Sequence, residues 1–369
     1  MIRTDELSLY EGRPFGNIML KSNYSELIRL GFRPGDSVDV LFSSGKVLED
    51  IPFLSACILP QGMMCLNAHE SFDWLRIEKR FGSAWDFCGM KGDETGRIIL
   101  HDPQKYAFLY RVFSTEFSLE RTDYPSDECF TNYRELSCGH MRRGILYRSV
   151  ASFDSFNVKP EFLERQKCLD RLMERDGIRY VINMTCDFQQ MKTIFESGAY
   201  KGFYIQKLYD EGKVYSDLLS VDFSGPVFRE QIASALRMLL KQPGPYLIQC
   251  KAGLDRTGFF CSLIGALAGA DQAEITEEYM CSYDSLFGLT REKDREKYDI
   301  LCRYQAERNI DIITQCSSSE EEHFSNEEQP SPRRKPEYTA GLCAAAEKYL
   351  KRCGFGESEI SELKKLLME

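Results

Sequence analysis

The sequence lacks features that mark several common classes of protein. Its 369 residues include only four histidines, and none of its fourteen cysteines stands in a C-x-x-C pair. This scarcity disfavours a structural zinc site. No apolar run approaches the ~18 residues that a membrane-spanning helix needs, and the start MIRTDELSLYEGRPFG has no apolar signal segment. Many cysteines without an export signal are typical of the reducing cytoplasm, so we expect a cytoplasmic protein.

Positive charge is also in short supply. The chain has 47 lysines and arginines against 57 aspartates and glutamates, for a formal net charge of −10. That balance disfavours a nucleic acid or an anionic membrane surface as a partner. An anionic ligand would therefore have to be held by a local basic pocket, and we expect neither a metal nor another cofactor.

The pattern along the chain predicts an α/β protein with an accessory domain. Residues 1–110 carry strand and turn signals and predict a small β-rich, barrel-like domain. Residues 111–140 are polar and irregular, as in a connector. From 141 to 369 strands alternate with helices, which predicts a mostly parallel central sheet flanked by helices. Within that domain, residues 316–336 are rich in Ser, Glu and Pro and predict a mobile acidic loop.

One short stretch, QCKAGLDRTG at 249–258, carries the clearest chemical signal. It follows an apolar run at 246–248 and precedes an apolar helical pattern at 259–269. Cys250 is therefore expected where a buried strand gives way to the beginning of a helix.

These residue types at this spacing suit phosphoryl transfer without a metal. A thiolate is a nucleophile near neutral pH when a helix N-terminus stabilises it. Successive backbone N–H groups can bind phosphate oxygens, and the planar guanidinium of Arg256 matches a phosphate. Gly253 allows the loop to turn inward, and Thr257 can place a hydroxyl near the sulfur. The residues expected to surround the phosphate are Lys251, Ala252, Gly253, Leu254, Asp255 and Thr257.

The stretch resembles the C-x5-R-[S/T] signature of the cysteine-dependent protein tyrosine phosphatases. It is most similar to a bacterial group whose loop is His-Cys-x-x-Gly-Lys-Asp-Arg-Thr-Gly. The resemblance extends over about 130–289 and includes CFTNYRELSCGHMRRGILYRS, GIRYVINM and EEYMCSYDSLFGL. It implies a phosphomonoester hydrolase that acts through a cysteinyl-phosphate on phosphotyrosine or, with dual specificity, on other phosphoresidues. A phosphorylated protein or a small phosphomonoester would be the partner.

Two departures from that loop leave alternatives open. Gln249 stands where the group has histidine, and Leu254 stands where it has lysine. Neither removes the nucleophile or the arginine. The same site would also suit a phosphoinositide or inositol phosphate, and a non-catalytic phosphate-binding protein is the rival class.

The resemblance also implies a general acid, an aspartate on a loop some thirty residues before the cysteine. Asp222 fits, because it precedes Cys250 by 250 − 222 = 28 residues and ends an apolar run. Asp210 is the runner-up, and Asp255 is a further alternative. For each of the first two the plain alternative is an aspartate that caps a helix or a turn.

Two other residues follow predicted strands of the same domain. Arg148 in LYRS is expected near the phosphate, with a place at the rim of the core as the alternative. Cys186 follows the predicted strand YVINMT; if that strand neighbours the one before Cys250, a disulfide between the two cysteines could protect the thiol. A packed, unreactive cysteine is the simpler interpretation.

The N-terminal region weakly resembles the small β-barrel of S-adenosylmethionine hydroxide adenosyltransferases, in GFRPGDSVDVLFSSG. No catalytic residue can be carried over from it. We expect a domain for packing or for positioning the substrate.

Overall fold

The structure is a computed structural model that describes residues 2–55, 59, 62–70, 72–80, 82–113, 117–153, 160–315 and 341–368. The chain forms two compact units, Met1–Glu116 and Phe117–Glu369. A small β-barrel and an α/β unit confirm the predicted fold class. The predicted acidic loop at 316–336 lies outside the described residues. In the part that is described, no helix is both long enough and apolar enough to cross a bilayer.

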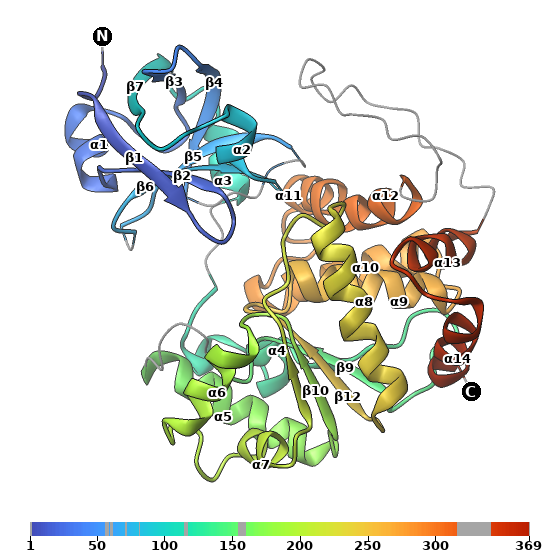
Figure 1. The fold of residues 1–369 in the computed structure, drawn as a ribbon. Helices are drawn as coiled ribbons and strands as arrows, with labels where there is room; N and C mark the ends of the chain where they lie inside the picture. Colours follow the sequence, from blue (N-terminus) through green and yellow to red (C-terminus); the bar gives the residue numbers. More distant parts are fainter. Residues whose placement is uncertain are drawn as a thin grey trace. The chain divides into compact units, whose positions relative to one another are not determined.

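The first unit is a closed barrel of seven strands in the order β1-β2-β6-β5-β4-β3-β7 (Figure 1). Its inward-facing positions are fully buried apolar residues, among them Ile18, Leu20, Phe53 and Ile77, and they form its own core. Closing the sheet leaves no exposed strand edge. Its elements are β1 (Leu7–Gly12), β2 (Asn17–Leu20), α1 (Tyr24–Leu30), β3 (Ser37–Phe42), β4 (Val47–Leu54), β5 (Met64–Asn67), β6 (Leu75–Lys79), α2 (Ala84–Cys88), β7 (Thr95–Asp102) and α3 (Ala107–Phe113).

The second unit is built on a five-stranded sheet in the order β11-β10-β12-β9-β8. Its strands are β8 (Arg134–Glu135), β9 (Leu146–Ser149), β10 (Tyr180–Asn183), β11 (Val214–Ser216) and β12 (Tyr246–Gln249). All but β8 run parallel, so the expected mostly parallel sheet is confirmed. Every residue of β10 and β12 is buried, as is typical of strands whose two faces are both covered by helices.

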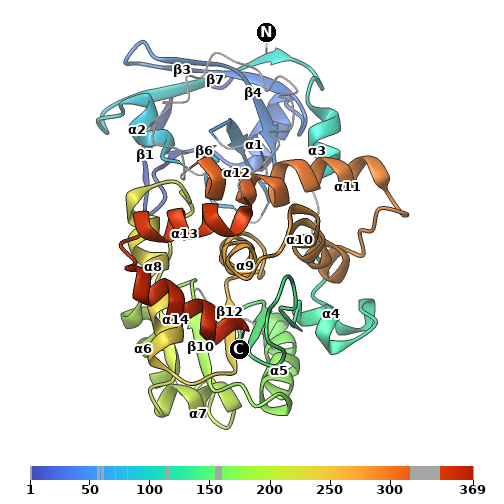
Figure 2. The ribbon, with the colours of Figure 1, turned by 90° about the vertical axis from the view of Figure 1, so that its right-hand side faces the viewer.

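Helices cover both faces of this sheet (Figures 1 and 2). On one face, Val181 of β10 and Leu247 of β12 pack with residues of α5, α6 and α7. On the other, Tyr246 of β12 donates its hydroxyl to the carbonyl of Leu239 in α8, at 2.7 Å. The helices are η1 (Arg121–Asp123), α4 (Asp127–Thr131), α5 (Pro160–Arg175), α6 (Phe188–Glu196), α7 (Tyr204–Asp210), α8 (Pro226–Lys241), α9 (Asp255–Leu267), α10 (Gln272–Phe287), α11 (Arg295–Leu301), the π-helical turn η2 (Cys302–Ala306), α12 (Glu307–Gln315), α13 (Leu342–Arg352) and α14 (Glu357–Met368).

The segment expected as a connector, 111–140, contains ordered elements of both units. The last residues of α3 belong to the first unit, and the second unit begins at Phe117. Strand β8 pairs with β9, with Arg134 opposite Arg148. The sheet therefore begins before residue 141, because Arg134 and Glu135 of this polar segment form its outermost strand.

Helix α9 is the central helix of the second unit, and Figure 2 views it nearly end-on. Every residue from Thr257 to Leu267 is buried, and α9 contacts α10, α12 and α13. Gly258 permits a close approach to α10, since a Cβ at this position would lie 2.3 Å from Cε2 of Tyr279. Such a contact is too short for any real Cβ, so the two helices can pack this closely only with glycine at 258.

Gly258→Ala is therefore expected to destabilise the second unit. In an ordinary helix interior alanine is more favourable than glycine by about 0.5–1 kcal/mol. Here the clash with Tyr279 should outweigh that gain and cost roughly 1–3 kcal/mol. Urea denaturation followed by far-UV circular dichroism measures the change. The same substitution combined with Tyr279→Leu should cost much less, and a single variant more stable than the wild type would contradict this packing.

Candidate active site

The loop from Cys250 to Arg256 joins the carboxyl end of β12 to the first turn of α9. Since β12 lies between β10 and β9, the loop stands where the carboxyl ends of three parallel strands meet, which is where open α/β sheets bind ligands. Cys250 is almost completely buried, with 3% of its surface exposed. The expected junction between strand and helix is therefore present.

Gly253 gives the loop its turn. Its φ of +67° lies in the left-handed region, where a residue with a Cβ is strained. A Cβ at this position would also lie only 2.4 Å from the carbonyl oxygen of Ser149 at the end of β9. Only glycine lets the loop pass this close to the neighbouring strand.

Donors beneath the loop hold its carbonyl groups. The Asn132 side-chain amide donates to the carbonyl oxygens of Ala252 at 3.1 Å and Gly253 at 3.3 Å. Arg148 donates to the same Gly253 carbonyl through Nη2. Asn132 is in turn fixed by Arg134, whose Nη1 donates to Oδ1 of Asn132 at 2.6 Å.

Glu278 of α10 joins these donors into one network. Its Oε2 accepts from Nη1 of Arg148 at 2.6 Å, and its Oε1 lies 2.8 Å from Nη2 of Arg134. Burial opposes the charge of Glu278, but the two guanidinium groups outweigh it and hold the pKa of the carboxyl below its usual value. Burial likewise opposes the charge of Arg148, yet Glu278 raises the pKa of that guanidinium above its ordinary value.

For Arg148 we expected a place near the phosphate, with the rim of the core as the alternative. Its side chain is fully buried beneath the loop and contacts the Gly253 carbonyl and Glu278. The physical reason is that the tight loop needs donors for its inward carbonyls, and arginine supplies several from one rigid plane. We therefore treat Arg148 as a support of the loop.

The sequence alone did not identify the three other residues that support the loop together with Arg148. Asn132 and Arg134 stand in the quoted stretch TNYRELSC, and Glu278 stands in EEYMCSYDSLFGL. In the sequence these three residues are polar side chains next to apolar positions, a pattern that many surface residues share and that therefore does not mark a site. Only the fold shows that the three meet beneath the loop.

Gln249 connects the three strands around Cys250. Its side chain is fully buried; Oε1 accepts from the backbone N–H of Ser152 at 3.0 Å, and Nε2 donates to Oδ1 of Asn183 at 3.3 Å. An amide can accept and donate at once. Gln249, which stands where the similar loops have histidine, thus fixes the start of the loop by hydrogen bonding.

Cys186 lies on the far side of Asn183. Its sulfur accepts from Nδ2 of Asn183 at 3.3 Å and lies 3.4 Å from Oγ of Ser216. Burial raises the pKa of the Cys186 thiol. Cys186 and Cys250 are both free thiols in this structure, and Cys186 is packed among polar partners of β10 and β11.

The remaining loop residues differ in exposure. Lys251 is exposed, Ala252, Leu254, Asp255 and Arg256 are half-buried, and Thr257 is fully buried. Arg256 donates through Nη1 to the carbonyl of Met184, the residue after β10. Among the described residues the hydroxyl of Thr257 has no hydrogen-bond partner, so it can donate to a neighbouring anion.

The two candidate acids lie at opposite edges of the sheet. Asp222 follows β11 and is half-buried; its Oδ1 accepts from Oγ of Ser224 at 2.9 Å. The ring of Phe223 packs against that of Phe259 in α9, with centroids 4.9 Å apart, which holds this loop beside the helix that Cys250 precedes. Asp210 ends α7, before β11 begins, and its exposed carboxylate accepts from Gln206. Since β11 and β12 point the same way, Asp222 follows the edge that carries Cys250 and Asp210 does not.

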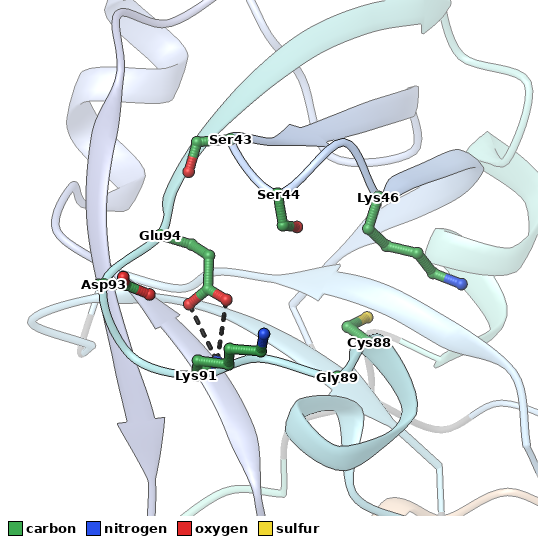
Figure 3. Close-up of a pocket in the computed structure, with 8 residues that line it drawn as sticks. All are labelled: Ser43, Ser44, Lys46, Cys88, Gly89, Lys91, Asp93 and Glu94. Atoms are coloured by element: carbon green, nitrogen blue, oxygen red, sulfur yellow. Dashed lines mark hydrogen bonds between the residues drawn. The ribbon is translucent and has the colours of Figure 1, made fainter.

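A pocket of about 530 Å³ lies in the first unit (Figure 3). Glu94 accepts there from the backbone N–H of Lys91, at 2.9 and 3.1 Å. Two lysines and two acidic residues line it, so their charges cancel and do not select an anion. Its lining is Ser43, Ser44, Lys46, Cys88, Gly89, Lys91, Asp93 and Glu94, which includes no residue of the Cys250 loop. Within the described ranges no cluster of histidine, cysteine and acidic residues is suited to hold a metal ion.

Two comparisons of sequence find similarity to known phosphatases. Residues 206–369 match the model of the tyrosine phosphatase family. A tyrosine-protein phosphatase of Nostoc commune is 30% identical over 143 residues, which cover 35% of this chain and 40% of the relative. The chain thus spans well under half the length of that relative.

Two solved structures are similar over about half of the chain. One is the core catalytic domain of the PP-IP phosphatase SIW14 from S. cerevisiae in complex with citrate, at 17% identity over 49% of this chain and 94% of that one, with a TM-score of 0.26. The other is P. aeruginosa TpbA, at 19% identity over 52% and 91%, with a TM-score of 0.27. Neither score supports a conclusion of its own, and the assignment comes from the family model and the relative in sequence. On that ground, residues 206–369 of the chain are similar in sequence to the tyrosine phosphatase family.

Proposed function

We propose that this protein hydrolyses phosphomonoesters without a metal, through a cysteinyl-phosphate on Cys250, and that phosphotyrosine is its substrate group. The observation that carries the proposal is the placement of a buried cysteine at the carboxyl end of β12, directly before a glycine turn and the N-terminus of α9. A helix N-terminus favours a thiolate and a bound phosphate alike.

The reaction would proceed in two displacements. The Cys250 thiolate attacks phosphorus, so that an S–P bond forms, the ester P–O bond breaks and Asp222 gives its proton to the leaving oxygen. Water then attacks the cysteinyl-phosphate, the S–P bond breaks and the Asp222 carboxylate accepts the water proton. Arg256 and the backbone N–H groups of the first turn of α9 stabilise the equatorial oxygens in both steps.

The surroundings of the loop favour an aryl phosphate. In the described part of the second unit, two large apolar side chains are strongly exposed: Phe188 at 57% and Val227 at 59%. They stand at the beginnings of α6 and α8, the helices that follow β10 and β11, on the edge of the sheet that carries Cys250. With Leu254 in the loop itself, this end of the sheet offers apolar contacts to a phenyl ring.

Cys250→Ser tests the nucleophile. An alcohol is a much weaker nucleophile than a thiolate, so release of p-nitrophenol from p-nitrophenyl phosphate in EDTA should be lost, while binding of inorganic phosphate, measured by calorimetry, should remain. Cys343→Ser, at a half-buried cysteine of α13, should behave as the wild type. A wild-type protein that binds phosphate but releases no p-nitrophenol would instead support the non-catalytic class.

Asp222→Asn tests the acid. A general acid matters for a poor leaving group, so hydrolysis of phenyl phosphate should slow by ~10²–10⁴-fold, and hydrolysis of an ester with a stable leaving anion should slow much less. Asp210→Asn is the matched control and should leave both rates unchanged. If Asp210→Asn shows the dependence on the leaving group and Asp222→Asn does not, the acid has been assigned to the wrong aspartate; if neither does, Asp255 becomes the candidate.

Leu254→Lys tests the substrate class. A partly exposed cation at the loop should lower the KM for inositol hexakisphosphate by about two- to fivefold, the range of exposed ion pairs, without improving p-nitrophenyl phosphate. Leu41→Lys adds the same charge at an exposed leucine of the barrel and should change neither. A wild-type preference for inositol hexakisphosphate over a phosphotyrosine peptide would overturn the aryl assignment and favour the inositol phosphate alternative.

A further inference from the structure

The Gly253 carbonyl is held by two donors at once, and this has a consequence for the other side of the loop. In a planar trans peptide the C=O and N–H groups point in opposite directions. The carbonyl of Gly253 belongs to the same peptide as the N–H of Leu254. Asn132 and Arg148 bind that carbonyl from beneath the loop, so the N–H of Leu254 must point away from them.

The neighbouring peptide is fixed differently. The carbonyl of Ala252 also accepts from Asn132, but the N–H of Gly253 is used within the loop, where it donates to the carbonyl of Cys250 at 3.3 Å. The first intrahelical bond of α9 reaches from the N–H of Gly258 back to the carbonyl of Leu254. The Gly253–Leu254 peptide therefore links the internal turn to the N–H groups at the start of the helix.

Asn132 and Arg148 can bind the Gly253 carbonyl only while their own side chains are fixed in place. Arg148 is anchored by Glu278, and Asn132 is anchored by Arg134, which is bound to the same glutamate. Without these anchors the peptide could rotate, because Gly253 has no side chain to oppose a change of φ and ψ. A rotated peptide would present its carbonyl oxygen to the phosphate, so the partial negative charge of that oxygen would face the negative charge of the phosphate.

We propose that Asn132, Arg134, Arg148 and Glu278 form a positioning network that keeps the Leu254 N–H directed into the phosphate site. The network acts through the backbone and contacts no substrate. This inference rests on the proposed function in treating the loop as a phosphate site, but it concerns anion binding as well as turnover.

Asn132→Asp is the sharpest test. The aspartate has nearly the same shape, still accepts from Arg134 and tolerates the left-handed backbone at φ = 50°. It removes the donor that binds both loop carbonyls and places an acceptor against them. The kcat/KM for p-nitrophenyl phosphate should fall by about 10²–10³-fold, as when one oxyanion donor is lost, and inhibition by orthovanadate should weaken.

The chain offers a matched control for this change. Asn309 of α12 is also fully buried, accepts from an arginine, Arg308, at 2.7 Å and donates to Oγ of Ser262 at 3.3 Å. Asn309→Asp alters the same chemistry away from the loop carbonyls. It should lower the melting temperature at least as much as Asn132→Asp and leave both kcat/KM and the affinity for orthovanadate near the wild-type values.

A second variant keeps the test decisive if Asn132→Asp does not fold. Arg134→Lys retains the charge beside Glu278 but loses the fork that fixes Asn132, and it should produce a smaller loss in the same direction. Equal losses in Asn132→Asp and Asn309→Asp, or an unchanged affinity in Asn132→Asp, would overturn the positioning network. If the wild type has no activity, calorimetric binding of inorganic phosphate provides the same comparison, so failure of the proposed function and failure of this inference are told apart.

Discussion

The loop from Cys250 to Arg256 depends on one buried carboxylate. Glu278 lies between the guanidinium groups of Arg134 and Arg148. Arg148 binds a carbonyl of the loop directly, whereas Arg134 binds Asn132, which in turn binds the loop. Buried charges are costly, and such an ion pair is weak evidence for stability in itself. Its value here is geometric, because removing any one member leaves another buried charge or carbonyl without its partner.

The parallel sheet explains why other candidate site residues follow strands at the same end of the sheet as this loop. Carboxyl ends of parallel strands share one edge, so the residues after β10, β11 and β12 all emerge there. Arg256 reaches the carbonyl of Met184 after β10, and the loop with Asp222 after β11 is held against α9 by Phe223. The same rule places Asp210, which precedes β11, at the opposite edge.

The barrel is a compact unit with a hydrophobic core of its own. The pocket that it contains has lysines and carboxylates in equal number. Nothing in that lining resembles the requirements of a phosphate dianion, which needs convergent donors and a net positive potential. The residues that match the tyrosine phosphatase family, 206–369, lie in the second unit.

Local sequence predicted the main elements of the second unit and the loop that begins at Cys250. Alternation of buried strands with amphipathic helices predicted the α/β unit, and a cysteine between a strand and a glycine turn identified the loop, because both depend on residues close in the chain. The network around Arg148 could not be predicted in this way. Asn132 precedes its partner Ala252 by 120 residues. Glu278 lies in α10, beyond the whole of α9. Tertiary packing decided it: a loop with inward carbonyls must be satisfied by whichever donors the fold brings beneath it, and local pattern carries no information about that choice.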